Sequence, residues 1–207
     1  MRKKIVAIEE PALTLHLEYD HITLGELGNI LIRLQAALRS IAGLSPGEYN
    51  GRYSHVQPHF ITSYVTSKNS IDVTLLLAVL AIALQAPGSI NEWSNFATET
   101  FRRFKMAVIA MVRGEIEVPH VQDKQEEMEF GQIESTAKDE GLFKVEITRG
   151  KIEMSRPFLD ELTPTQLRKL FNFLWSITGP TNRVDIGNEE SQLSLEWSEG
   201  EDVKRLE

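Results

Sequence analysis

Apolar and polar residues alternate along several short stretches of this chain. In Leu13–Tyr19, "LTLHLEY", every second residue is apolar, and a shorter candidate, "KIVAI", precedes it. The stretches Phe60–Thr66 and Ile71 onward flank Ser67–Ser70, which has turn chemistry. A period of two is typical of strands with one buried face, so the pattern predicts a strand followed later by a hairpin.

Two other segments carry apolar residues at helical spacing behind a capping signal. Thr23 with Glu26 three residues later, and Thr163 with Gln166, both match the capping box that opens many helices. Pro164 suits the first helical position. The pattern predicts one helix that ends near Gly43 and a second that ends at Gly179-Pro180.

A third helix is predicted from Ile90 to about Arg113. Ser89 and Glu92 form another capping box at its start. A 3–4 repeat of mostly large apolar residues predicts one buried side: Ile90, Trp93, Ala97, Phe101, Phe104, Val108 and Met111.

The longest apolar run, Leu75–Leu84, precedes this helix. As a helix it would span about 15 Å, half of the roughly 30 Å of a bilayer core, so the sequence predicts no stable membrane span. We expect it to pair with the third helix as a central apolar helical hairpin. Part of that hairpin would then be covered by a second copy of the chain or by another protein. The expected interface residues are Leu76, Val79, Leu80, Ala83, Trp93, Phe96, Phe101 and Phe104.

An acidic, polar segment at 115–141 resembles a linker and divides the chain into a part at 1–114 and a smaller part at 142–207. The second part is predicted to be ββαββ. Its first hairpin, "LFKVEITRGKIEMS", turns at Arg149-Gly150 and sets Ile147 opposite Ile152. Its last hairpin lies in "RVDIGNEESQLSLEW".

The predicted fold class is α+β, with antiparallel β-hairpins and capped helices packed around the helical hairpin. Ile22–Gly43 and Leu162–Gly179 share a cap, a hydrophobic staple and a glycine stop. This likeness raises the hypothesis of an internal strand–helix–hairpin repeat. Convergence is the alternative, since capping boxes recur for physical reasons.

Charge and composition exclude several function classes. A formal charge of −8 and a pI of about 5.2 disfavour nucleic-acid binding. The absence of cysteine excludes disulfides, thiol catalysis and cysteine-ligated metals, and it fits a cytoplasmic location. No nucleotide-binding or hydrolase motif occurs, so no cofactor and no catalytic residue are predicted.

The best candidates for a ligand site lie beside a strand end and in the Gly43–Pro58 loop. Asp20 and His21 precede a helix N-terminus, where backbone N–H groups attract anions. Charged, aromatic and titratable side chains gather in and just after the loop at Arg52, Tyr53, His55 and His59. His55 and His59 are four residues apart, but Pro58 argues against the helix that such a zinc pair needs, so no metal site is predicted.

These observations favour a non-enzymatic cytosolic interaction or assembly protein that forms a homo-oligomer or binds a protein partner. One alternative is an enzyme or small-ligand-binding protein that uses the loop at residues 43–58. The other is a conditional membrane-active protein that exposes residues 75–84.

Overall fold

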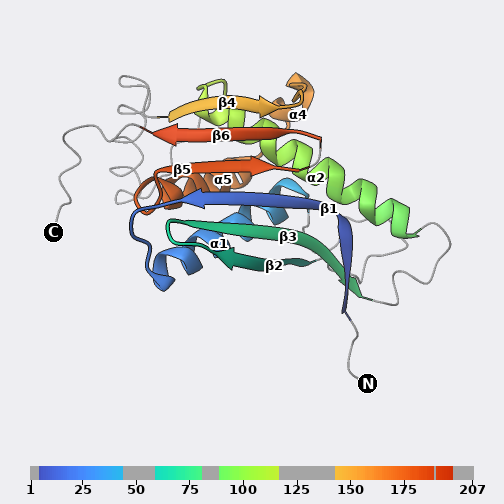
Figure 1. Cartoon of the computed structure of the whole chain (residues 1–207). Coiled ribbons are helices and arrows are strands. Elements are labelled where there is room, and N and C mark those ends of the chain that lie inside the picture. Colours follow the sequence, from blue (N-terminus) through green and yellow to red (C-terminus); the bar gives the residue numbers. More distant parts are fainter. Residues whose placement is uncertain (1–4, 44–58, 81–88, 117–142, 189, 198–207) are drawn as a thin grey trace.

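The computed structural model describes residues 5–43, 59–80, 89–116, 143–188 and 190–197. Figure 1 shows one antiparallel sheet with the helices gathered behind it. The predicted α+β fold is confirmed. Strands from both of the predicted parts, 1–114 and 142–207, belong to this sheet. Most of the predicted linker, 117–141, lies outside the described residues.

The sheet has six strands in the order β2-β3-β1-β5-β6-β4. Alternation of side chains places a leucine, isoleucine or valine toward the helices at every second position of the inner strands. The strands are β1 (Ile5–Glu18), β2 (His59–Thr66), β3 (Ser70–Leu80), β4 (Phe143–Arg149), β5 (Arg183–Gly187) and β6 (Gln192–Trp197).

β1 lies in the sheet between a strand from the N-terminal half of the sequence and one from the C-terminal half. It pairs with β3 on one side, and its Thr14–Glu18 stretch pairs with β5 on the other. The register with β3 shifts between Ile8 and Leu13, where residues 9–12 lie opposite Leu76 alone. Pro11 lies in this irregularity, as expected for a residue that cannot donate to a strand ladder. The two predicted strands are therefore one bulged strand.

The described helices are α1 (Leu24–Ile41), α2 (Ser89–Val112), α4 (Arg156–Asp160) and α5 (Pro164–Thr178). Both predicted capping boxes outside α2 are confirmed: Thr23 Oγ1 accepts from the Glu26 N–H, and Gln166 Oε1 accepts from the Thr163 N–H at 2.7 Å. Gly43 has a φ of 67°, the left-handed geometry that ends many helices. The cap predicted at Ser89 lies outside the described side chains.

Removing either confirmed cap should weaken its helix by a similar amount. Thr23→Ala and Thr163→Ala each delete a hydroxyl that accepts a backbone N–H in the first turn, so each should lower the free energy of unfolding by about 1 kcal/mol. Urea denaturation measures the change. Thr165→Ala, at an exposed position on the first turn of α5, is the control and should stay within about 0.5 kcal/mol of the wild type.

The hydrophobic core lies between the sheet and the helices. The α2 residues Phe101 and Phe104 are fully buried and touch Phe60 of β2 and Phe173 of α5, with ring centroids 5.9 and 5.6 Å apart. α2 crosses behind the strands, as Figure 1 shows, and so ties the two ends of the sheet together. The predicted buried side of α2 is confirmed from Trp93 to Val108, whereas Met111 is partly buried and Ile90 is 59% exposed.

The prediction of a central helical hairpin is wrong. Residues 75–80 of the apolar run belong to strand β3, between β2 and β1, and residues 81–84 lie outside the described residues. Leu75 and Leu77 face the helices, and Ala78 is fully buried as well. A strand with neighbours on both sides satisfies its backbone in the sheet, so a short apolar run can be a strand as readily as a helix.

The hairpin predicted around Arg149-Gly150 is also wrong. β4 pairs with β6, so Ile147 lies opposite Leu193 instead of Ile152. Leu193 is fully buried and gives Ile147 an apolar cross-strand partner, and residues 151–155 form no strand.

Two units of the fold share their connectivity but not their hand. In the first unit, α1 connects β1 to β2, and β3 lies between these two strands in the sheet. In the second unit, α5 lies in the connection from β4 to β5, and β6 lies between these two strands. α1 and α5 pack together on one face, whereas β1 and β4 run in opposite directions. The two crossovers therefore have opposite hand, and no rotation superposes them. The likeness between the units rests on element order and capping chemistry.

Candidate functional site

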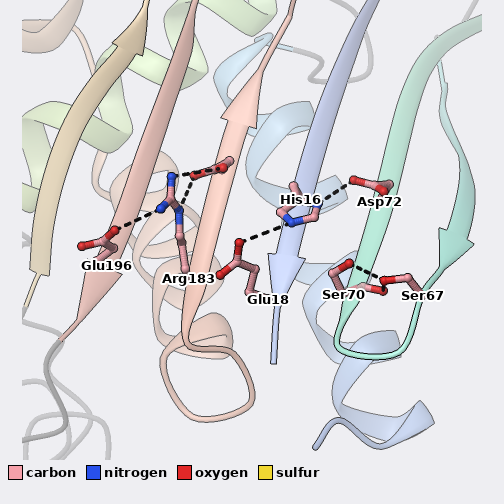
Figure 2. Close-up of polar contacts among 8 residues, drawn as sticks. His16, Glu18, Ser67, Ser70, Asp72, Arg183 and Glu196 are labelled. Atoms are coloured by element: carbon pink, nitrogen blue, oxygen red, sulfur yellow. Dashed lines mark hydrogen bonds and ion pairs between the residues drawn. The ribbon is translucent and has the colours of Figure 1, made fainter. Parts of the chain in front are cut away.

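The face of the sheet away from the helices carries a ladder of charged side chains. Figure 2 shows it crossing β3, β1, β5 and β6. His16 Nδ1 lies 2.7 Å from Asp72 Oδ1, and His16 Nε2 lies 3.5 Å from Glu18 Oε1. Arg183 contacts Asp185 at 3.0 Å and Glu196 at 3.3 Å. These pairs come from neighbouring strands or from alternate residues of one strand, so they follow directly from the register.

The chemistry of this ladder is mainly structural. The Asp72 carboxylate fixes one ring nitrogen of His16, and Glu18 faces the other. Asp185 is the main reason that the pKa of Arg183 rises above its usual value, since its carboxylate accepts hydrogen bonds from the guanidinium. Within the described ranges, no group of three His, Asp or Glu residues could hold a metal ion.

Lys105 on α2 is the one charged side chain buried in the described part of the chain, with 1% exposure. Its Nζ donates to Asn188 Oδ1 at 2.7 Å and to Ser191 Oγ at 2.6 Å. Burial lowers the pKa of Lys105 to about 8, because the charged form loses hydration. The ammonium ties α2 to the β5–β6 turn and lies too deep to meet a ligand.

The described structure includes the side chains of only two of the predicted ligand residues, Asp20 and His21. Asp20 and His21 are both exposed in the bend before α1. Arg52, Tyr53 and His55 lie outside the described residues. His59 is the first residue of β2, and its side chain is not among those described. The ligand-site hypothesis therefore stays a prediction.

The predicted interface residues divide between the core and less buried positions. Trp93, Phe101 and Phe104 have at most 1% exposure and pack within the chain's own core. Leu76 and Phe96 are partly buried. The side chains of Val79 and Leu80 in β3, and the whole of Ala83, lie outside the described residues.

The outer edge of β2 is a second surface with binding potential, which we call the β2 edge. In the turn that follows β2, the Ser67 N–H donates to Ser70 O at 2.9 Å. Because backbone groups alternate in direction along an antiparallel pair, those of Phe60, Thr62, Tyr64 and Thr66 point away from β3. Gln35 of α1 confirms this direction, since its Nε2 reaches Phe60 O from outside the ladder at 3.0 Å.

Apolar side chains are exposed on both sides of the β2 edge. Tyr64 is 59% exposed on the helix side, and Val65 is 71% exposed on the open side. β2, "HFITSYVT", contains no Lys, Arg, Asp or Glu. The other edge strand, β4, instead has exposed Lys144 and Glu146 on its open side. Proteins commonly blunt edge strands with such charges, and of the two described edge strands β4 has them and β2 does not.

Sequence reasoning identified the strand at Phe60–Thr66 but not its place at an edge. Strand order depends on the pairing of β1 with β3 and β5, which are far away in the sequence. The available signal was the lack of charge in β2 compared with the alternating charges of β4.

No family model matches the chain, and no curated protein resembles it significantly. Among the described helices, none has both the length and the hydropathy needed to cross a membrane.

Proposed function

We propose that this chain is a non-enzymatic cytosolic assembly protein, and that it associates by adding a partner strand at the β2 edge. The observation that carries the proposal is an uncharged edge strand with Tyr64 and Val65 exposed on its two sides. It replaces the expected helical interface, because the aromatic side chains of that interface pack inside the core.

Strand addition suits the chemistry of this edge. The outward N–H and C=O groups of Thr62, Tyr64 and Thr66 offer a ladder of main-chain hydrogen bonds. Alternate side chains then contact the partner on the two faces of the extended sheet. An uncharged strand adds no desolvation cost for buried ions, which would oppose association.

Tyr64→Pro tests the β2 edge directly. Proline removes an N–H that points away from β3, so it should block strand addition and leave the β2–β3 ladder intact. Tyr64→Thr keeps the N–H and is the matched control. We expect affinity purification from the native source to recover an associated protein, either another copy of this chain or a different protein, with the wild-type and Tyr64→Thr baits. Recovery with the Tyr64→Pro bait should fall at least tenfold.

Circular dichroism must show that the Tyr64→Pro bait is folded. Val65→Lys is a second variant, which places a charge on the open side of the edge beside Asp72 of β3 and imitates Lys144 of β4. It should also reduce recovery. Equal recovery with all four baits, each of them folded, would show that association does not use the β2 edge.

A further inference from the structure

We infer that the strand added at the β2 edge is β2 of a second copy of the chain, paired antiparallel about a twofold axis at Ser63. This inference rests on the proposed function, because it names the partner at that same edge. A continuous sheet through both copies then has the helices of each copy on the same side.

The direction of the backbone groups limits the register of this pairing. Only outward-pointing residues can exchange hydrogen bonds across the edge, so Phe60, Thr62, Tyr64 and Thr66 must face residues of the same set. A twofold axis at Ser63 sets Thr62 opposite the partner copy's Tyr64, and Phe60 opposite its Thr66. This register gives every outward-pointing residue of β2 a partner, whereas an axis at Thr62 or at Tyr64 leaves one of the four opposite no residue of the other β2.

The same register is favourable for the side chains. On the open side, Val65 of each copy lies against the strand of the other copy. On the helix side, Tyr64 lies opposite Thr62, and pairs of this type stabilise sheets. Val65 is 71% exposed in the single chain, so this pairing would bury an apolar surface that is now in water.

The local charge at the edge is compatible with a second copy. The chain has a formal charge of −8, which opposes self-association, so two copies meet at the lowest electrostatic cost where the contact surface is uncharged. At a twofold axis, a charged residue would lie close to the same residue of the other copy, and like charges directly opposite each other are destabilising. β2 has no Lys, Arg, Asp or Glu, as such a contact requires.

One side of α1 extends this apolar surface on the helix side of the edge. Gln35 reaches β2, so the side of α1 that carries it faces the free edge. Leu24 lies eleven residues earlier, about three turns, and therefore on the same side, and it is 87% exposed. Gly28 lies between them, and nothing lies within 4 Å of where its Cβ would be. The two copies would thus place Leu24 and Tyr64 over the joined strands.

A single cysteine at residue 63 tests the axis. The chain has no native cysteine, so Ser63→Cys gives one exposed thiol per chain. At a non-hydrogen-bonded antiparallel pair the two Cα atoms lie about 4.5 Å apart, within the range that a disulfide spans. We expect mild oxidation at micromolar concentration to give a disulfide-linked dimer that reducing agent returns to single chains.

Val65→Cys is the matched control on the same side of the same strand. In the proposed register the two residues at position 65 are separated by about 13 Å along the strands, too far for a disulfide. This variant should stay at 23.5 kDa on a denaturing gel under the same oxidation. Before oxidation, light scattering should give the wild type twice that mass, and Tyr64→Pro a single mass.

The results separate this inference from the function on which it rests. A wild type that stays at a single mass up to high micromolar concentration, together with a Ser63→Cys variant that forms no disulfide, would overturn self-pairing. The proposed function would nevertheless stand if the wild-type bait recovered a different protein and the Tyr64→Pro bait did not. A wild-type dimer that is insensitive to Tyr64→Pro, with no disulfide in the Ser63→Cys variant and equal recovery of partners with all four folded baits, would overturn both.

Discussion

Gly150→Ala should lower the free energy of unfolding by about 3 kcal/mol, and the melting temperature by roughly 6 to 12 °C. Gly150 has a φ of 69°, a left-handed conformation that costs alanine about 1 kcal/mol or more. Its added Cβ would also lie 2.1 Å from the Glu190 carbonyl oxygen. Backbone must move to relieve that contact, and the β5–β6 turn that moves also holds the partners of Lys105.

Gly114→Ala separates the two causes. Gly114 has a φ of 67°, but nothing lies within 4 Å of its ideal Cβ position. It therefore has the conformational strain without the steric contact, and it should cost only about 1 kcal/mol. Urea denaturation of the two variants gives the difference. Equal losses would mean that the turn at Glu190 yields to the extra methyl group at no cost.

The second large effect is a dependence of stability on pH that comes from Lys105. Burial lowers its pKa from 10.5 to about 8, so between these values the unfolded chain binds a proton that the folded chain does not. Stability rises with pH wherever the unfolded state binds more protons. The destabilisation from burying this ammonium is thus fully present below pH 8 and is lost as the pH rises to about 10.5.

Lys105→Met removes this titration and keeps most of the buried side-chain volume. Relative to the variant, the wild type should gain about 3 kcal/mol of stability between pH 7.5 and 10.5. Denaturation curves at several pH values measure both proteins. Subtracting the free energy of unfolding of the variant from that of the wild type at each pH removes the contribution of the other groups that titrate at alkaline pH. A stability difference that does not change with pH would show that the ammonium is not desolvated in the folded state.

Local sequence signals predicted the elements whose cause is local. The capping boxes at Thr23 and Thr163 depend on residues three positions apart, and both are present in the structure. The alternation in Leu13–Tyr19 marked a strand with one buried side, and Leu13, Leu15 and Leu17 are all fully buried. These features need no knowledge of the rest of the fold.

The alternation from Ile71 predicts the start of β3, but the continuous apolar run Leu75–Leu84 does not by itself distinguish a strand from a buried helix. Ile71, Val73 and Leu75 are buried, whereas Asp72 is exposed and Thr74 partly so, which is a period of two. That period marks a strand before the continuous apolar part begins at Leu75. The ambiguity disappears once β1 and β2 are known to flank β3, but sequence patterns alone do not give that pairing.

The candidate site was harder to predict than the fold for the same reason. Among the described strands, β2 is an edge because it pairs with β3 alone, and sequence patterns do not show which strands pair. The aromatic side chains of α2 looked like an interface because the sequence does not show that Phe60 and Phe173 cover them. Whether an aromatic side chain of α2 is on the surface or in the core depends on contacts with residues far away in the sequence.

The pairing of β1 with β5 has a consequence for how the chain is made. Thr14 bonds to Gly187, 173 residues later, so the middle of the sheet cannot close until residues 183–187 have left the ribosome. Until then, β1 presents an open edge beside the buried leucines at 13, 15 and 17. Non-local pairings of this kind slow folding and expose chains to aggregation. Chaperone occupancy during synthesis should therefore persist until residues 183–187 emerge.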